Sequence, residues 1–151
     1  MVVSLSERAR IVEEALKRAG LRVARHVGVL EVEVDKSRIV EAALALRELG
    51  FDHVKAVVAV DEPENERIRV SYVVSSFDES ETLVALTVDV SRSDPRLESL
   101  TRVWPSTELQ EREVYELFGV VFENHPDLRP VLLDPELAEK KVMRRDFRIE
   151  W

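Results

Sequence analysis

The sequence predicts an α+β fold, a two-layer sandwich with helices packed on a mostly antiparallel sheet, plus a C-terminal helix and an irregular extended tail. Three observations lead to this prediction. Helical stripes of apolar residues are interspersed with segments in which apolar and polar residues alternate. Two of the alternating segments are joined by a short polar turn, as in an antiparallel hairpin. The alternation also leaves one face of each strand wet, which favours helices on the other face only.

Two helices are predicted in the first third of the chain. The first covers residues 4–19, where Ser4 opens a capping box and Gly20 is a C-terminal stop. The second opens at Asp35 or Ser37, has an apolar stripe with helical spacing, and ends at Gly50. Each helix has one apolar face to place against the sheet.

Four strands are expected around the second helix. The first, at residues 27–34, ends in alternating valine and glutamate, and the next covers residues 53–60. The strands at 67–76 and 82–90 face each other across the turn at 77–81, so we expect an antiparallel hairpin. The order of elements is then α-β-α-β-β-β.

The character of the chain changes after residue 92. Residues 1–92 are expected to form the α+β core, and 93–151 the third helix and a partner-docking tail within one continuous domain. The third helix is predicted over residues 106–118 and ends at Gly119. Residues 120–151 are rich in proline, aspartate and arginine and have little periodicity. A tail of this kind is typical of a binding segment or of one that needs a partner.

Composition restricts the function. The net charge of −8 argues against binding nucleic acid or an anionic membrane surface directly. The absence of cysteine excludes Cys-ligated iron–sulfur clusters, Cys-based zinc sites and thiol chemistry. No run of about 18 apolar residues predicts a membrane span, and we expect a cytoplasmic protein without a signal peptide. The scarcity of amide side chains is typical of thermophiles.

The most specific text lies in the last third. Residues 111–120 read E-R-E-V-Y-E-L-F-G-V, Phe122 follows, and residues 125–129 read H-P-D-L-R. Residues 143–147 read M-R-R-D-F. These segments resemble the signature of the C-type subunit of complex I, the small cluster-free member of its hydrophilic arm. The family pattern is E-R-E-x-[FY]-D-[LM]-F-G-[IV]-x-F-x-G-H-P-D-L-R-R, followed later by P-L-R-K-D-[FY].

The resemblance implies a non-catalytic structural or assembly subunit of a membrane-bound oxidoreductase. Its partners would be a hydrogenase-large-like subunit, a small cluster-bearing subunit and a ferredoxin-like subunit. This chain would bind no cofactor, whereas the partners would carry iron–sulfur clusters and, in hydrogenase-type complexes, a nickel–iron site. The chain would lie peripherally on the cytoplasmic side of the membrane and contact it only through the complex.

Several positions depart from the respiratory pattern. Leu109 stands where an aromatic residue is common, Asn124 replaces a glycine, and Pro130 replaces an arginine. With the thermophilic composition, these departures favour relatives in archaeal membrane-bound hydrogenase, sulfane reductase or formate hydrogenlyase complexes. The resemblance does not choose between these and a respiratory NADH dehydrogenase.

The predicted docking residues are polar and aromatic positions in and around the signature. They are Trp104, Glu111, Arg112, Glu113, Tyr115, His125, Arg129, Arg144, Arg145, Asp146 and Phe147.

The glutamates of the signature have three interpretations. Glu113 and Glu116 are three apart and share a helix face, whereas Glu111 and Glu113 do not. Docking or structural pairing, with Arg112 as the ion-pairing member, is favoured over a solvated face and over acid–base catalysis.

The histidine and the aromatic residues are each open to a structural interpretation. His125 is better explained as a hydrogen-bonded turn residue beside Pro126 than as a metal ligand. Phe118 is expected in the core, whereas Trp104 and Tyr115 are interface candidates.

A basic run stands out against the acidic background. Its members are Lys140, Lys141, Arg144, Arg145 and Arg148. It is either solvated charge or an arm that grips an acidic surface of a partner.

Two rival functions stay open. One is a free-standing enzyme that uses Glu113, Glu116 and His125. The other is an independent α+β binding module, for example a ferredoxin-like domain for RNA, although the acidic balance speaks against RNA.

Overall fold

The computed structural model of the chain describes residues 7–76, 82–130, 141, 143 and 144. In chain order the elements are α1 (Glu7–Arg18), β1 (Arg22–His26), β2 (Val29–Val34), η1 (Lys36–Arg38), α2 (Ile39–Glu48), β3 (His53–Glu62), η2 (Pro63–Asn65), β4 (Arg67–Ser75), β5 (Leu83–Ser91), β6 (Arg96–Glu98), α3 (Thr107–Phe118) and β7 (Val121–Glu123).

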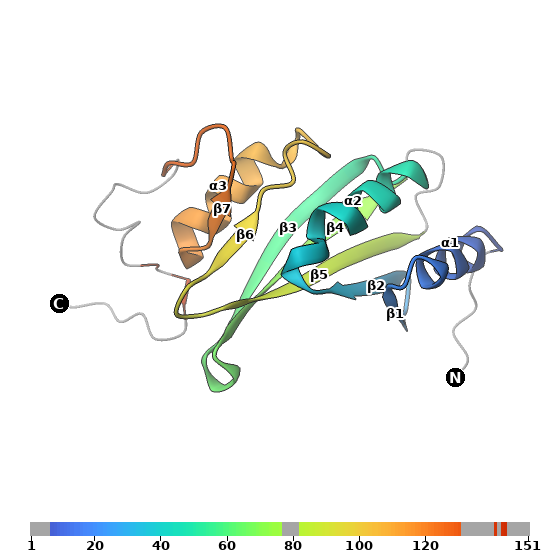
Figure 1. Ribbon diagram of the computed structural model, residues 1–151, viewed down its shortest axis with the longest axis horizontal. Helices are drawn as coiled ribbons and strands as arrows, with labels where there is room; N and C mark the ends of the chain where they lie inside the picture. Colours follow the sequence, from blue (N-terminus) through green and yellow to red (C-terminus); the bar gives the residue numbers. More distant parts are fainter. Residues whose placement is uncertain (1–6, 77–81, 131–140, 142, 145–151) are drawn as a thin grey trace.

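The main sheet has five strands in the order β1-β2-β5-β4-β3. The pairs β1–β2, β5–β4 and β4–β3 are antiparallel, and β2–β5 is parallel. Figure 1 shows α2 across the middle of this sheet, with α1 toward one end and α3 toward the other. The predicted α+β sandwich with a mostly antiparallel sheet is therefore confirmed.

One face of the sheet carries the core. On β4, the side chains of Ile68, Val70, Tyr72 and Val74 are fully buried. Arg67, Arg69 and Ser71, on the opposite face of the sheet, are only partly buried, and we call this the open face. All three helices and the segment that follows β5 contribute to the same cluster of buried residues. A domain of this size can build such a core without disulfides or metals.

The predictions missed three strands. β1 has the sequence RVARH, and four of its five residues are exposed, so no apolar alternation marks it. β6 and β7 have three residues each and pair in parallel as a separate two-stranded sheet. β7 lies within the tail that was expected to be irregular. Such short segments carry too few residues for a periodic signal.

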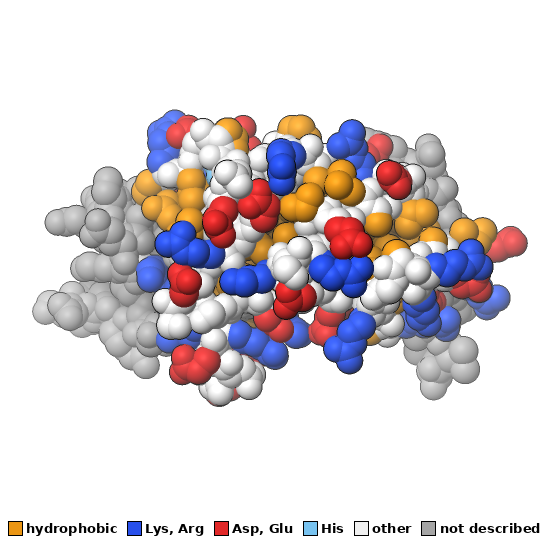
Figure 2. Space-filling model, in the orientation of Figure 1, with side chains coloured by type: hydrophobic (Ala, Val, Ile, Leu, Met, Phe, Trp, Pro, Cys, Tyr) orange, Lys and Arg blue, Asp and Glu red, His pale blue; other side chains and the backbone are white. Residues whose placement is uncertain are grey.

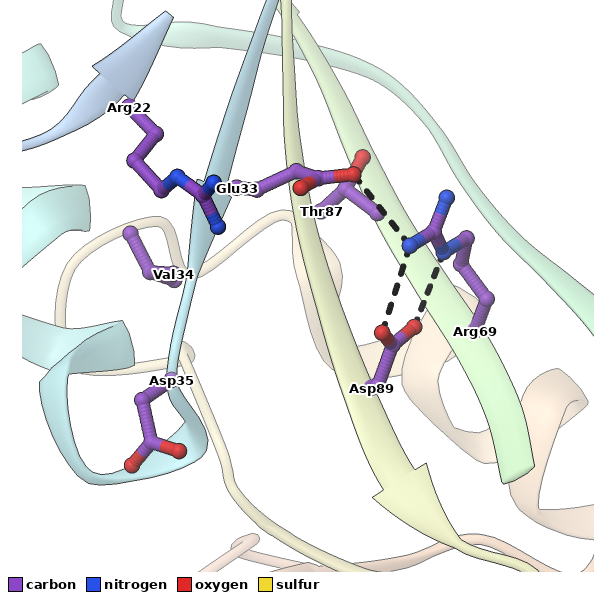
Figure 3. A pocket seen from close by; sticks show the side chains of 7 residues that line it. All are labelled: Arg22, Glu33, Val34, Asp35, Arg69, Thr87 and Asp89. Atoms are coloured by element: carbon purple, nitrogen blue, oxygen red, sulfur yellow. Dashed lines mark hydrogen bonds and ion pairs between the residues drawn. The ribbon is translucent and has the colours of Figure 1, made fainter. Parts of the chain in front are cut away.

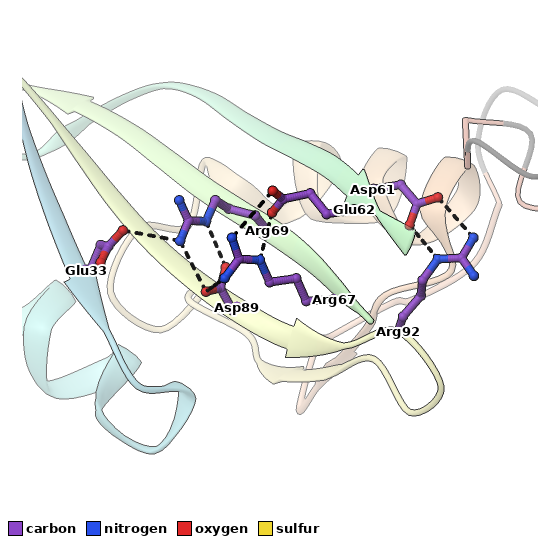
Figure 4. Close-up of polar contacts among 7 residues, drawn as sticks. All are labelled: Glu33, Asp61, Glu62, Arg67, Arg69, Asp89 and Arg92. Atoms are coloured by element: carbon purple, nitrogen blue, oxygen red, sulfur yellow. Dashed lines mark hydrogen bonds and ion pairs between the residues drawn. The ribbon is translucent and has the colours of Figure 1, made fainter. Parts of the chain in front are cut away.

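The open face of the sheet carries a network of ion pairs, drawn in Figure 4. Arg69 donates to both oxygens of Asp89, at 2.8 and 3.2 Å, and pairs with Glu33 at 3.2 Å. Arg67 pairs with Glu62 at 2.8 Å and with Asp89 at 3.3 Å. The network links β2, β5, β4 and β3, and each arginine has at least two carboxylate neighbours. Its charges are therefore largely compensated within the chain.

Candidate docking surface around α3

The ends of α3 are defined by local contacts. The helix starts after Ser106, as predicted, but the Ser106 side chain makes no capping hydrogen bond. The Thr107 hydroxyl instead donates to the carbonyl of Trp104 at 2.8 Å. Gly119 ends the helix with a φ of 79° and donates its N–H to Tyr115 O. This left-handed conformation favours glycine.

Glu111 faces the interior and is fully buried. Its carboxylate accepts hydrogen bonds from Tyr72 Oη at 2.5 Å, from Ser99 Oγ at 2.6 Å and from the Leu100 N–H at 2.9 Å. The carboxylate therefore joins α3 to β4 and to the segment that follows β6. Burial raises the pKa of Glu111, and the hydrogen bonds from Leu100, Ser99 and Tyr72 oppose that shift.

Trp104 is also enclosed. Its side chain is 2% exposed, and its indole N–H donates to Phe51 O at 2.9 Å. Its ring lies 6.4 Å from that of Tyr72. Glu111 and Trp104 were predicted as docking residues, but in this structure they hold α3 and its N-terminal connector on the sheet. These buried contacts fix the position of α3 and therefore of the residues on its outer side.

Arg112 lies on the outer side of α3 and holds the loop after β7. Its side chain is 12% exposed, with Nη1 4.0 Å from Asp127 Oδ2 and Nε donating to Arg129 O at 3.4 Å. Arg129 in turn donates to Asp127 at 2.9 Å. The hydrogen bond from Arg129 lowers the pKa of Asp127. Asp127 is thus the centre of this cluster, although it was not among the predicted docking residues.

His125 is a turn residue, as predicted. Its Nδ1 lies 3.0 Å from the N–H of Asp127, and its Nε2 lies 2.9 Å from the carbonyl of Glu108. Since Nδ1 accepts from a backbone N–H, the proton sits on Nε2 and donates to Glu108 O. Both ring nitrogens therefore bind the backbone, and the histidine ties residues 125–127 to α3.

The chain returns to the C-terminal end of α3. The Met143 N–H donates to Leu117 O at 3.0 Å, and Arg144 Nε donates to Phe118 O at 2.7 Å. The stem of Lys141 lies against Gly119, where an added Cβ would be only 2.6 Å from Lys141 Cε. These contacts satisfy carbonyls that a helix leaves without partners at its C-terminus.

The remaining predicted residues fall into two groups. Glu113 and Tyr115 on α3 are half-buried, and Phe118 is in the core, as predicted. Arg145, Asp146 and Phe147 lie outside the described residues, as do Lys140 and Arg148 of the basic run.

Two large apolar side chains are exposed around this helix. Leu109 on α3 is 49% exposed, and Met143 beside the end of α3 is 55% exposed. Figure 2 shows apolar side chains in small groups between charged ones on this side of the molecule, with one group over α3. We call Leu109, Pro126, Arg129 and Met143 the α3 surface. It combines apolar anchors with a charged margin, as protein interfaces do.

The described residues contain no cluster of three or more His, Asp or Glu side chains that could hold a metal ion. The hollow drawn in Figure 3, of about 340 Å³, lies on the open face of the sheet. It is lined by charged residues that include Arg22, Glu33, Asp35, Arg69 and Asp89. Figure 3 shows Arg69 reaching both Glu33 and Asp89, so the charges of these three residues compensate one another.

A comparison with known protein families identifies the family to which this fold and this signature belong. The family model described as "respiratory-chain NADH dehydrogenase, 30 Kd subunit" matches residues 32–150. The chain belongs to this family. The match begins within β2 and continues through β3, β4, β5 and α3 to residue 150, so it includes most of the sheet and the α3 surface. It confirms the resemblance found in the sequence.

Two relatives of this chain within the 30 kDa subunit family are subunits of different complexes. The C-type subunit of the F420H2 dehydrogenase of Methanosarcina mazei is 32% identical over 89% of this chain and 83% of its own length. The C-type subunit of the NADH-quinone oxidoreductase of Thermus thermophilus is 35% identical over 91% of this chain and 70% of its own.

A solved structure shares the fold. A chain in the structure of the membrane-bound sulfane sulfur reductase, an archaeal respiratory membrane complex, is 24% identical, with a TM-score of 0.85. It covers 95% of this chain, which in turn covers 87% of it. The two relatives are thus named as subunits of a dehydrogenase and of a quinone oxidoreductase, whereas the solved structure shows the shared fold. No helix among the described residues of this chain is long and apolar enough to cross a membrane.

Proposed function

We propose that this chain is a non-catalytic structural subunit of the hydrophilic arm of a complex I-like oxidoreductase. It docks through the α3 surface and its tail onto the hydrogenase-large-like subunit and the small cluster-bearing subunit. The observation that carries the proposal is that the signature residues form their contacts with other parts of the same chain. Glu111, Arg112 and His125 make hydrogen bonds to other segments of the chain and so hold the helix and the following loop in place.

The role of the subunit is then positional. Arg112 and His125 fasten the loop at residues 125–129, and Arg144 fastens the returning tail. Groups held in this way present a fixed surface to a partner, which lowers the entropic cost of association. Electron transfer would take place on the iron–sulfur clusters of the partners, and on a nickel–iron site in a hydrogenase-type complex. The proposed set of partners also includes a ferredoxin-like subunit.

The proposed site of action is the cytoplasmic side of the membrane. The chain would be peripheral and would reach the membrane only through its partners. The names of the relatives support a place in a multi-subunit oxidoreductase. The net charge of −8 favours contact with protein over direct contact with anionic lipid.

The test is capture of partners by the tagged chain from source membranes solubilised in mild detergent, with the retained chains identified by mass. We expect a large metal-site subunit and a Cys-rich cluster subunit. Leu109→Lys should reduce their recovery roughly ten-fold, the loss expected when a central interface residue is disrupted.

Leu44→Lys is the matched control, because Leu44 is 45% exposed and Leu109 is 49% exposed. Leu44 lies on α2, away from the α3 surface. Capture of no partner by the unaltered chain, or turnover of a small substrate by the chain alone, would contradict the proposal.

A further inference from the structure

The two edges of the main sheet differ in kind. β1 is five residues long, contains two arginines and a histidine, and is mostly exposed. β3 is ten residues long, and its residues 56–60 read A-V-V-A-V. Short and charged edges resist pairing with another strand, whereas a long apolar edge invites it. Only β1 therefore has the features of a protected edge.

The main chain of β3 is paired on one side. It pairs with β4 from His53 to Glu62, with a bulge between Val54 and Ala56. Within the part of the chain that the structure describes, residues 54–60 make no other backbone hydrogen bond. Alternate N–H and C=O groups of this segment therefore point away from the sheet, as they do on any edge strand.

The side chains of β3 are incompletely covered on both faces. Val58 and Val60 lie on the open face, opposite Ser71 and Arg69, and are 46% and 44% exposed. Val57 lies on the core face, where it is half-buried, although its partner Tyr72 is fully buried. An added strand would cover both faces at once, because side chains alternate along it.

We propose that β3 is a second docking edge, onto which another subunit of the complex adds an extended strand. The inference rests on the proposed function, since it assigns a further surface to the same assembly. The added strand would have aliphatic residues at alternate positions over Val58 and Val60. Its backbone would complete the hydrogen bonds of residues 54–60, as in other cases of strand addition.

Charge defines the ends of the added strand. Lys55 is exposed at the bulge. At the other end, Glu62 is paired with Arg67, and Asp61 with Arg92 at 2.7 Å. Lys55 is the one lysine or arginine within β3, so a carboxylate on the partner strand would be placed near it. Complementary charge at one end sets the register of the added strand.

The edge strand lies beside α3, the helix that carries the α3 surface. Of the three helices, α3 makes the most extensive contact with β3. Figure 1 shows β3 as the outermost strand on the side of the sheet where α3 lies. A partner seated on the α3 surface can thus extend a segment along β3 without leaving the interface.

Hydrogen exchange tests the edge directly. Amide exchange would be measured with residue resolution in the isolated chain and in the purified native complex. We expect alternate amides of residues 54–60 to exchange roughly ten-fold more slowly, or slower still, in the complex. The amides of β1 are the internal control. Equal exchange at residues 54–60 in the two samples would overturn the inference.

A variant provides the second measurement. Val58→Lys places a charge on the edge, a device that natural proteins use against strand addition. It should lower recovery of the partner and remove the protection of residues 54–60, whereas Leu44→Lys should do neither. Circular dichroism and the melting temperature would show that both variants fold.

The outcomes separate the two proposals. If Leu109→Lys loses the partners but Val58→Lys keeps them and the edge stays unprotected, the proposed function stands and the edge inference fails. If the isolated chain forms a dimer that Val58→Lys abolishes, the edge binds a second copy, and the assignment to another subunit is overturned.

Discussion

Tyr72 on β4 donates a hydrogen bond to Glu111 on α3 at 2.5 Å, and both side chains are fully buried. Through this contact a residue of the family signature is part of the buried core. The same carboxylate accepts from Ser99 and from the Leu100 N–H. The signature helix is therefore anchored to the sheet and to the segment after β6 from its inner side.

Replacing Glu111 should test that anchor. Glu111→Ala strips three buried donors of their acceptor, and we expect a loss of about 3 kcal/mol or more in the free energy of unfolding. Glu111→Gln keeps the shape and can still accept from Tyr72 and Leu100 while donating to Ser99, so it should cost less than about 1.5 kcal/mol. Urea unfolding of the three proteins is the measurement. Equal losses in the two variants would contradict the hydrogen-bond argument.

Glu111 should also make stability depend on pH. Its pKa is raised in the folded state, chiefly by burial, from an ordinary value of 4.5. Folding thus favours the protonated form of Glu111. The contribution of this protonation to the free energy of unfolding is full below pH 4.5 and is lost as the pH rises through the pKa of the folded state. The stability of the wild type relative to Glu111→Gln should therefore fall with rising pH. Urea titrations from acid to neutral pH measure this difference, which would stay constant if burial did not shift the pKa.

The buried pair between Arg92 and Asp61 should matter more than exposed pairs. Asp61 is 3% exposed and accepts from Arg92 at 2.7 and 3.0 Å. Arg92→Ala takes this bidentate partner from a buried carboxylate, and about 3 kcal/mol should be lost. Arg96→Ala is the matched control, because Arg96 and Asp94 form an exposed pair whose loss should cost less than about 1 kcal/mol. Similar melting temperatures for the two variants would sink this prediction.

Gly119 should tolerate alanine less well than Gly28. Both have a positive φ, which costs a residue with a Cβ about 1–2 kcal/mol. At Gly28 an added Cβ meets nothing within 4 Å, whereas at Gly119 it would meet the Lys141 stem. Gly119→Ala should therefore be the more destabilising, and Lys141→Ala in the same chain should remove the excess. A double-mutant cycle by chemical denaturation measures this coupling; additive effects would contradict it.

Arg112→Ala should release the loop at residues 125–129 without unfolding the core. The guanidinium loses Asp127 and the Arg129 carbonyl, and both contacts lie at the surface. We expect faster amide exchange in this loop, lower capture of partner subunits and little change in melting temperature. Arg18→Ala is the control, since Arg18 is exposed on α1. Normal yield of the complex with lost turnover would argue for a catalytic role instead.

Much of the fold followed from local patterns in the sequence. The alternation of Ile68, Val70, Tyr72 and Val74 predicted a strand with one buried face, and that strand is β4. Gly119 after an amphipathic stretch predicted the end of α3. These features are determined locally, because the periodicity of side chains and a left-handed stop each depend on a few consecutive residues.

The parallel pairing of β2 with β5 and the existence of β1 needed the tertiary structure. Pairing joins segments far apart in the chain, and an edge strand with polar side chains leaves no apolar signal. The burial of Glu111 was likewise hidden, because a glutamate enters a core only where donors from distant segments meet it. A buried tyrosine on β4 was the one local hint, since its hydroxyl needs a partner. The sequence by itself determined the three α-helices, the four longest strands, the family signature and the absence of cysteine chemistry. Only the tertiary structure decided which signature residues face inward and which sheet edge stays open, because burial and pairing depend on contacts between remote parts of the chain.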